Sequence, residues 1–281
     1  MKSLILSFIL LISMLNGKPK NSFDISKDLV FVAGGNVFFA EPKVDQNGIP
    51  IPSDSLTSFF IGATEVTNRQ YKDFVDALKA KGANWEEMLP DTTAWRLPGS
   101  YNEPLVKHYY QHQKYDNYPV VGVTLVQANA YANWLSSIFP KYLFCVPTKS
   151  QWVYAGRRET LADYTHDWFQ DAHGKYNYNF KQLDQESVAY NAQTNKYELK
   201  GRVWFNYFTD GYLYPSNTKA FSPSAYGIYE LCGNVAELVS DDTVAMGGSW
   251  NDAGYDIRIL SEKPAAASDC TIGFRITAAL K

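Results

Sequence analysis

The 281-residue sequence contains little cysteine and has no excess of positive charge. Its three cysteines, Cys145, Cys232 and Cys270, allow at most one disulfide, and their apolar neighbours favour small buried thiols over a bridge. The formal net charge of -3 gives no electrostatic reason to expect nucleic acid as a partner. Twenty tyrosines are present instead, which suit either an irregular core or a binding surface.

A long apolar run occurs only at the start of the chain. Lys2 precedes an almost wholly apolar stretch at residues 4–15, and residues 16–19 end it. The stretch is short for a bilayer span, so we expect a secretory signal peptide over residues 1–20, cleaved near Gly17. An uncleaved anchor or a buried helix is the alternative. We expect an exported protein that is periplasmic, outer-membrane-associated or secreted, with no transmembrane or lipid anchor after cleavage.

Residues 21–281 are predicted to form one domain of the α+β class. Three capping boxes, in which a Thr is followed three residues later by Gln, predict helix starts; they begin at Thr67, Thr124 and Thr148. Short apolar runs predict strands; they lie at residues 29–32, 37–39, 59–61, 244–246 and 274–276. The first two runs flank Gly34 and Gly35, which favours a hairpin.

Five short motifs follow one another along the chain, and each is weak alone. They are IGATEVTN at 61–68, YPVVGVT at 118–124, VPT at 146–148, YGIYELCGNVAE at 226–237 and GGSW at 247–250, closed by GFR at 273–275. Together they resemble the formylglycine-generating enzyme (sulfatase-modifying factor) family. The resemblance implies that family's variant of the C-type-lectin-like fold: a small twisted antiparallel sheet, two or three main helices and long ordered loops.

The enzymes of this family oxidise a client cysteine to formylglycine with two cysteines that hold Cu(I), a soft ion that prefers thiolates. In those enzymes the cysteines follow the Ser of the Gly-Gly-Ser motif by three and eight residues. Here these positions hold Asp252 and Ile257, and Cys270 lies in another segment. The resemblance therefore implies a pseudoenzyme without copper. An oxidase with altered ligands is the alternative.

Two other branches of the family bear on function. The iron-dependent sulfoxide synthases need an added helical domain with metal-binding histidines; here His108 and His112 are four residues apart, but their neighbours favour a surface loop. The gliding-motility and type IX secretion envelope proteins lack the catalytic cysteines, and residues 103–104, 110–123 and 233–237 are similar to theirs. This branch implies a non-catalytic scaffold or binding protein with envelope or secretion-system partners.

Calcium is the metal that the resemblance implies, because the family's enzymes hold structural calcium on two oxygen-rich loops. The first site would use the Glu230 and Glu237 side chains and the carbonyls of Gly233 and Val235. The second would use Asp210, Asn206 and the carbonyls of Tyr207 and Tyr212. The alternative is that Glu237 and Asp210 cap turns or pair with Arg275 or Lys219.

A residual groove is expected where the enzymes have their active site, with Trp250, Asp252 and Tyr255 around it. An aromatic-lined groove suits a peptide strand or a glycan. The alternatives are that Asp252 is simply solvated and that Trp250 anchors the core. A third function therefore stays open beside the scaffold and the oxidase, namely a ligand-binding protein of the C-type-lectin-like kind.

Overall fold

A computed structural model describes residues 21–281 apart from 41–42, 159, 168, 183–187, 195 and 200–209. The predicted signal peptide at residues 1–20 lies outside the described residues. In the part of the chain that the structure describes, no helix is long and apolar enough to cross a membrane.

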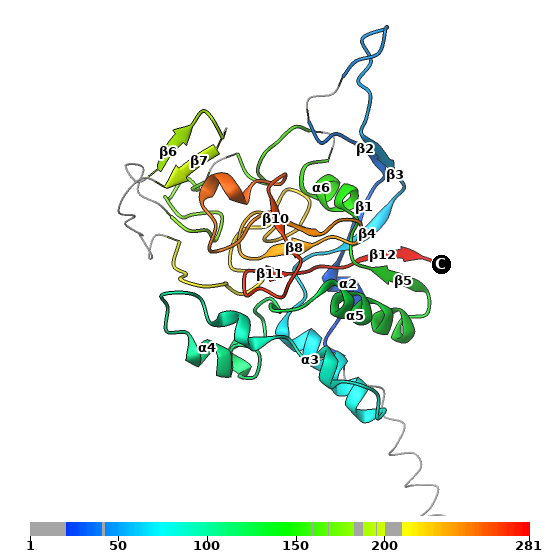
Figure 1. The fold of residues 1–281 in the computed structure, drawn as a ribbon. Coiled ribbons are helices and arrows are strands. Elements are labelled where there is room, and N and C mark those ends of the chain that lie inside the picture. Colours follow the sequence, from blue (N-terminus) through cyan, green and yellow to red (C-terminus); the bar gives the residue numbers. More distant parts are fainter. Residues whose placement is uncertain are drawn as a thin grey trace, which may run out of the picture.

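Two small four-stranded sheets form the centre of the molecule (Figure 1). The first is antiparallel throughout and has the order β1 (Leu29–Val32), β4 (Phe59–Gly62), β12 (Thr277–Leu280), β5 (Tyr142–Cys145). The second has the order β10 (Glu262–Pro264), β9 (Val244–Met246), β8 (Ala236–Leu238), β11 (Ile272–Gly273), and only its β11–β8 pair is parallel. Two separate ribbons complete the strands: β2 (Gly35–Val37) with β3 (Asp54–Leu56), and β6 (Val188–Asn191) with β7 (Lys196–Leu199).

The three predicted capping boxes all form and begin the three longest described helices. In each, the Thr hydroxyl accepts from the amide of the Gln three residues on, and the Gln side chain accepts from the Thr amide. The helices are α3 (Asn68–Ala80), α5 (Leu125–Ile138) and α6 (Lys149–Arg157). Shorter turns are α2 (Ile25–Asp28), α4 (Glu103–His108), η2 (Glu86–Met88), η3 (Thr92–Trp95), η4 (Gln113–Tyr115) and η6 (Gly254–Ile257).

The first sheet separates two apolar clusters, with α3 and α5 on one side and α6 on the other (Figure 1). Alternate residues of β4 pack in the two clusters, because neighbouring side chains of a strand point to opposite faces. Ile61 packs with Trp152 of α6, whereas Phe60 packs against the α3–α5 side. There Tyr71 and Tyr131 stack with ring centroids 5.8 Å apart. The resulting fold is α+β with small, mainly antiparallel sheets.

Three local expectations need correction. The predicted hairpin at Gly34 and Gly35 does not form: β1 pairs with β4 and β2 with β3. A two-residue hairpin turn needs a positive φ, and neither glycine has one. The predicted strand at 274–276 instead connects β11 to β12 and carries Arg275 into the core. The segment around His108 is not a loop, because His108 ends helix α4, but His108 and His112 are both exposed, as expected of a surface position.

Candidate functional site

Three buried glutamates surround one buried arginine at the centre of the molecule. Glu65 follows β4, Glu237 belongs to β8, and Arg275 lies between β11 and β12; all three side chains are fully buried. Glu230, ahead of β8, is 7% exposed. Buried charges are normally paired or neutralised, so one arginine must compensate a group of up to three carboxylates.

Glu237 is the one glutamate of the three that accepts hydrogen bonds from the Arg275 guanidinium. Both of its oxygens accept from the Arg275 guanidinium, and one also accepts from Trp152 Nε1 at 2.7 Å. Arg275 directs further donors at the carbonyls of Gly62, at 2.9 Å, and Tyr229, at 3.0 Å. The alternative interpretation, in which Glu237 pairs with Arg275, is therefore confirmed.

The other two glutamates favour their protonated forms. Burial raises the pKa of Glu65 well above its usual range, and the neighbouring carboxylates of Glu230 and Glu237 raise it further against the opposing effect of Arg275. Burial also raises the pKa of Glu230 to about 8, although the amide of Phe221 donates to its carboxylate at 3.1 Å. At pH 7 the cluster thus holds an ion pair and a predominantly neutral Glu230, and the pKa of Glu65 is shifted in the same direction.

Asn234 joins this cluster to the neighbouring loops. Its backbone adopts the left-handed region with a φ of 57°, which Asn tolerates better than most residues. Its Nδ2 donates to Glu65 at 2.8 Å, and its Oδ1 accepts from the amide of Ser216 at 2.8 Å and from Asn179 Nδ2 at 3.1 Å. Glu65 Oε2 has no hydrogen-bond partner among the described residues.

A groove of about 590 Å³ lies beside this centre, lined by residues 97–100, 180–182, 210, 212–214 and 250–251. We call it the Trp250 groove. Trp250 is held from behind by Trp95, stacked with ring centroids 6.1 Å apart, and by Tyr214 at 5.2 Å. It is only 7% exposed, so it both anchors the core and contributes to the groove wall.

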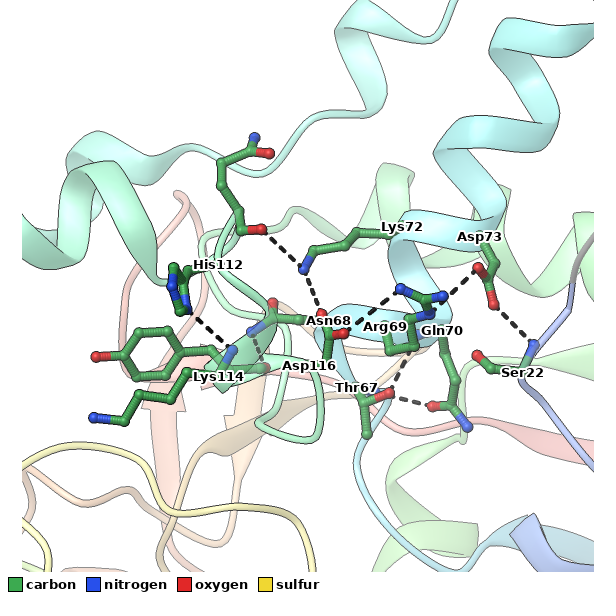
Figure 2. Close-up of polar contacts among 12 residues, drawn as sticks. Ser22, Thr67, Asn68, Arg69, Gln70, Lys72, Asp73, His112, Lys114 and Asp116 are labelled. Carbon is green, nitrogen blue, oxygen red and sulfur yellow. Dashed lines mark hydrogen bonds and ion pairs between the residues drawn. The ribbon is translucent and has the colours of Figure 1, made fainter.

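The start of α3 is fixed to the loop after α4 by charged side chains (Figure 2). Asp116 accepts from Lys72 Nζ at 2.6 Å and lies 3.5 Å from Arg69 Nη1. In the same loop, His112 Nδ1 accepts from the amide of Lys114 at 3.1 Å. His112 therefore caps the turn η4. The loop that follows leads into the YPVVGVT motif.

The model of the sulfatase-modifying factor enzyme 1-like domain matches residues 16–280. The chain belongs to this family. The formylglycine-generating enzyme of Thermomonospora curvata is 24% identical over 249 residues, which are 78% of this chain and 72% of that enzyme. The serine/threonine-protein kinase pkn1 of Chlamydia pneumoniae is 23% identical over 217 residues, or 77% of this chain, but the match covers only 28% of the kinase.

Solved structures share the family fold at low identity. PvdO from Pseudomonas aeruginosa superposes with a TM-score of 0.59 at 20% identity, covering 94% of this chain and 100% of PvdO. The Treponema denticola variable protein 1 gives a TM-score of 0.52 at 17% identity, covering 89% of this chain and 94% of that one. At such identities the likeness establishes the fold alone.

The two positions expected to hold the copper ligands of this family have other roles here. Asp252 accepts from Ser249 Oγ at 2.5 Å and forms an ion pair with Lys263 at 3.3 Å. Ile257, in η6, is fully buried in the apolar cluster around α6. The Cys270 thiol is also buried, and its pKa is raised to about 12, chiefly by burial. None of these groups offers an accessible thiolate.

Of the three residues expected around a groove, only Trp250 lines it. Asp252 is next to the lining residue Asn251, and its carbonyl accepts from the amide of Lys181 at 2.9 Å. Tyr255 lies against Arg258, whose guanidinium is 3.8 Å from the ring centroid, and is 42% exposed. The sequence-based prediction thus located one wall of the groove.

The first predicted calcium loop does not fit a cation as it stands. Both oxygens of Glu237 already accept hydrogen bonds, from Arg275 and Trp152. The Glu230 carboxylate accepts one from the amide of Phe221. Gly233 and Val235, whose carbonyls were the other expected ligands, belong to the same buried segment. No group of three or more acidic, histidine or cysteine side chains in the described ranges is arranged for a metal ion. Calcium at this loop stays a prediction.

The second predicted calcium loop is described only in part, because Asn206 and Tyr207 lie outside the described residues. Asp210 accepts from the amides of Tyr212, at 3.0 Å, and Phe180, at 3.2 Å, and burial raises its pKa. Burial also raises the pKa of Tyr212, with contributions from Glu230 and Asp210. Both residues line the Trp250 groove.

Glu65 and Lys181 are site residues that the sequence-based predictions did not include. Glu65 had a signal: it is an acid three residues after the end of β4, in a motif whose other residues carry no charge. Lys181 had none, because residues 163–201 show no clear periodicity and its place in the groove depends on long-range packing.

Proposed function

We propose that this chain is a non-catalytic binding protein of the sulfatase-modifying factor family, and that its ligand enters the Trp250 groove. The observation that carries the proposal is the surroundings of Asp252 and Ile257, the two positions expected to hold copper ligands. Asp252 is held by Ser249 and Lys263, and Ile257 is buried among apolar side chains. Cu(I) requires soft ligands, and these positions supply a hard oxygen and a hydrocarbon. We also propose that the fold is a C-type-lectin-like variant.

The test is incubation of the purified protein with copper and a peptide that contains Cys-x-Pro-x-Arg. We expect the peptide mass to remain unchanged, while a formylglycine-generating enzyme run in parallel produces the aldehyde. An aldehyde formed by this chain, and abolished by Asp252→Ala, would overturn the non-catalytic proposal and favour an oxidase with altered ligands.

We further propose that the protein is exported and works with envelope proteins, in an assembly similar to those of gliding motility or type IX secretion. The support is the resemblance of residues 110–123 and 233–237 to that branch. Cross-linked pull-down of the tagged, full-length protein from native envelopes should recover a stoichiometric complex with outer-membrane or secretion components. Recovery as a free monomer contradicts this part of the proposal.

Structural calcium is proposed separately, for the loop from Glu230 to Glu237. Binding there requires Glu237 to exchange Arg275 for the ion, so occupancy is coupled to a rearrangement of the buried ion pair. Metal analysis should find calcium in the purified protein, and a chelator should lower its melting temperature. Unchanged melting together with no bound calcium would refute this assignment.

A further inference from the structure

A second groove, of about 570 Å³, lies where the start of α3 meets two surface loops. We call it the Thr218 groove. Its lining comes from four segments, within residues 22–28, 64–70, 114–118 and 217–219. Figure 2 shows part of this lining, including Thr67, Arg69, Gln70 and Lys114. Every described lining residue carries a polar side-chain atom, and none of them lines the Trp250 groove. The Thr218 groove is therefore a separate and strongly polar site.

Thr218 gives this groove a hydroxyl without a partner. The residue is only 4% exposed, and its amide donates to the carbonyl of Asn117 at 3.0 Å. Its hydroxyl makes no hydrogen bond with any residue that the structure describes, and it is not sealed in the interior, so it opens onto the groove. A polar group on a side chain buried to this extent normally has a hydrogen-bond partner. The Thr218 hydroxyl therefore indicates a polar group that enters from the groove.

Two lysines bring cations to the same groove without an acid opposite them. Neither Lys114 nor Lys219 forms an ion pair within the described ranges. The Lys114 ammonium lies 5.6 Å from the ring centroid of Tyr115, and the Lys219 ammonium lies 5.6 Å from that of Tyr229. An aromatic ring attracts an ammonium group but does not neutralise its charge. Both lysines therefore remain available to an anion.

The other charges around the groove nearly compensate one another. Asp116 accepts from Lys72 at 2.6 Å, and Asp73 lies 3.8 Å from Arg69. The remaining acid in the lining, Asp28, accepts from a backbone amide at 2.9 Å and from a glutamine amide at 3.2 Å. The two unpaired lysines thus face one acid, which leaves an excess of one positive charge. That excess suits a ligand with a single negative charge.

We propose that the Thr218 groove binds a small hydroxylated compound with one carboxylate, such as an acidic sugar. Lys114 and Lys219 attract the carboxylate, and the Thr218 hydroxyl donates to a ligand oxygen. The side-chain hydroxyls and amides of the lining suit sugar hydroxyls, because both kinds of group can donate and accept. The ring of Tyr118, also in the lining, offers a flat apolar surface. A volume of about 570 Å³ is within the range of small-ligand sites. This site is additional to the proposed function, and neither depends on the other.

The test is an NMR-monitored titration of the full chain with glucuronate, its neutral amide glucuronamide, glucose and glucose 6-phosphate. The buffer is depleted of calcium without an anionic chelator, because a chelator would compete for the lysines. Loss of a charge-assisted hydrogen bond should weaken binding by about tenfold or more. We therefore expect glucuronate to bind at least about tenfold more tightly than glucuronamide or glucose. Equal affinity for acid and amide, no binding of glucuronate, or tighter binding of glucose 6-phosphate would overturn the proposal.

Three variants place the ligand in the groove. Lys219→Gln should bring the affinity for glucuronate down to that for glucuronamide; this lysine is exposed, so its replacement tests binding and not folding. Thr218→Val keeps the shape of the side chain without its hydroxyl, and it should weaken the binding of both compounds by about fivefold. Lys107→Gln is the matched control, because it removes an exposed cation of α4 outside the lining. It should leave both affinities unchanged, and an equal loss in Lys107→Gln and Lys219→Gln would contradict the site.

Discussion

The stability of the protein should depend on pH through its buried glutamates. Glu230 ionises near pH 4.5 in an unfolded chain, whereas its pKa in the folded protein is about 8. The folded state therefore holds an extra proton between these values. The contribution of this proton to the free energy of unfolding is fully present below pH 4.5. It is lost as pH rises between the two pKa values, and it is gone above about pH 8. At about 1.4 kcal/mol per factor of ten in proton affinity, the full loss is roughly 5 kcal/mol.

Glu230→Gln removes this dependence, because glutamine cannot ionise and still presents an oxygen to the amide of Phe221. At pH 5 the free energy of unfolding of the variant should be close to that of the unaltered protein. At pH 8.5 the variant should be more stable, by up to roughly 5 kcal/mol. Glu65→Gln should act in the same direction, since the pKa of Glu65 is also raised by burial. Urea unfolding at a series of pH values, with a calcium chelator present so that no ion is bound beside Glu230, measures both.

The control is Glu103→Gln, at a carboxylate that is about half exposed and pairs with Arg96 at 2.7 Å. Its pKa is lowered by that hydrogen bond, so it is ionised in folded and unfolded chains throughout the range tested. The difference between this variant and the unaltered protein should not change between pH 5.5 and 8.5. If the profile of Glu230→Gln also runs parallel to that of the unaltered protein, Glu230 ionises normally and the account of the cluster is wrong.

Three substitutions test the packing around the site, each by chemical unfolding at pH 7. Arg275→Met leaves Glu237 buried without its cation and should cost about 3–5 kcal/mol; a cost below about 1 kcal/mol would contradict the ion pair. Gly233→Ala places a methyl group against the carbonyl of Asn179 at a φ of 80° and should cost at least about 3 kcal/mol, whereas Gly82→Ala, with a φ of 65° in open space, should cost only about 1–2 kcal/mol. Ile257→Ala, at a fully buried position, should cost about 2–5 kcal/mol; a neutral result would mean that this position is open.

The sequence predicted the features that a few neighbouring residues determine. Each capping box needs only a Thr and a Gln three positions later, and all three helices begin where expected. The failed predictions were those that depend on distant partners. Gly34 lies against the backbone of Leu56, so the chain leaves the sheet there and does not turn back. The connection at 274–276 resembles a strand in composition, but it must bring Arg275 to Glu237.

The candidate site was less predictable for the same reason. The Arg275 guanidinium reaches a carbonyl 213 residues away in the chain, at Gly62, through the pairing of β12 with β4. The Trp250 groove likewise draws on four separated segments. No local sequence pattern predicts that Lys181 and Gln182 line the same groove as Trp250, because their positions depend on the packing of the whole domain.

The GNVAE motif at residues 233–237 explains why the family fold can be recognised from the sequence while the family's oxidase activity does not follow from it. Asn234 and Glu237 are both buried, and between them they engage Glu65, Asn179 and Arg275. A change at either position leaves a buried polar group without its partner, which is costly in any member with this packing. The two positions expected to hold copper ligands are used differently here: Asp252 pairs with Ser249 and Lys263, and Ile257 packs in the apolar cluster around α6. The motifs of this sequence therefore specify the buried polar centre, and they do not fix which residues stand at positions 252 and 257.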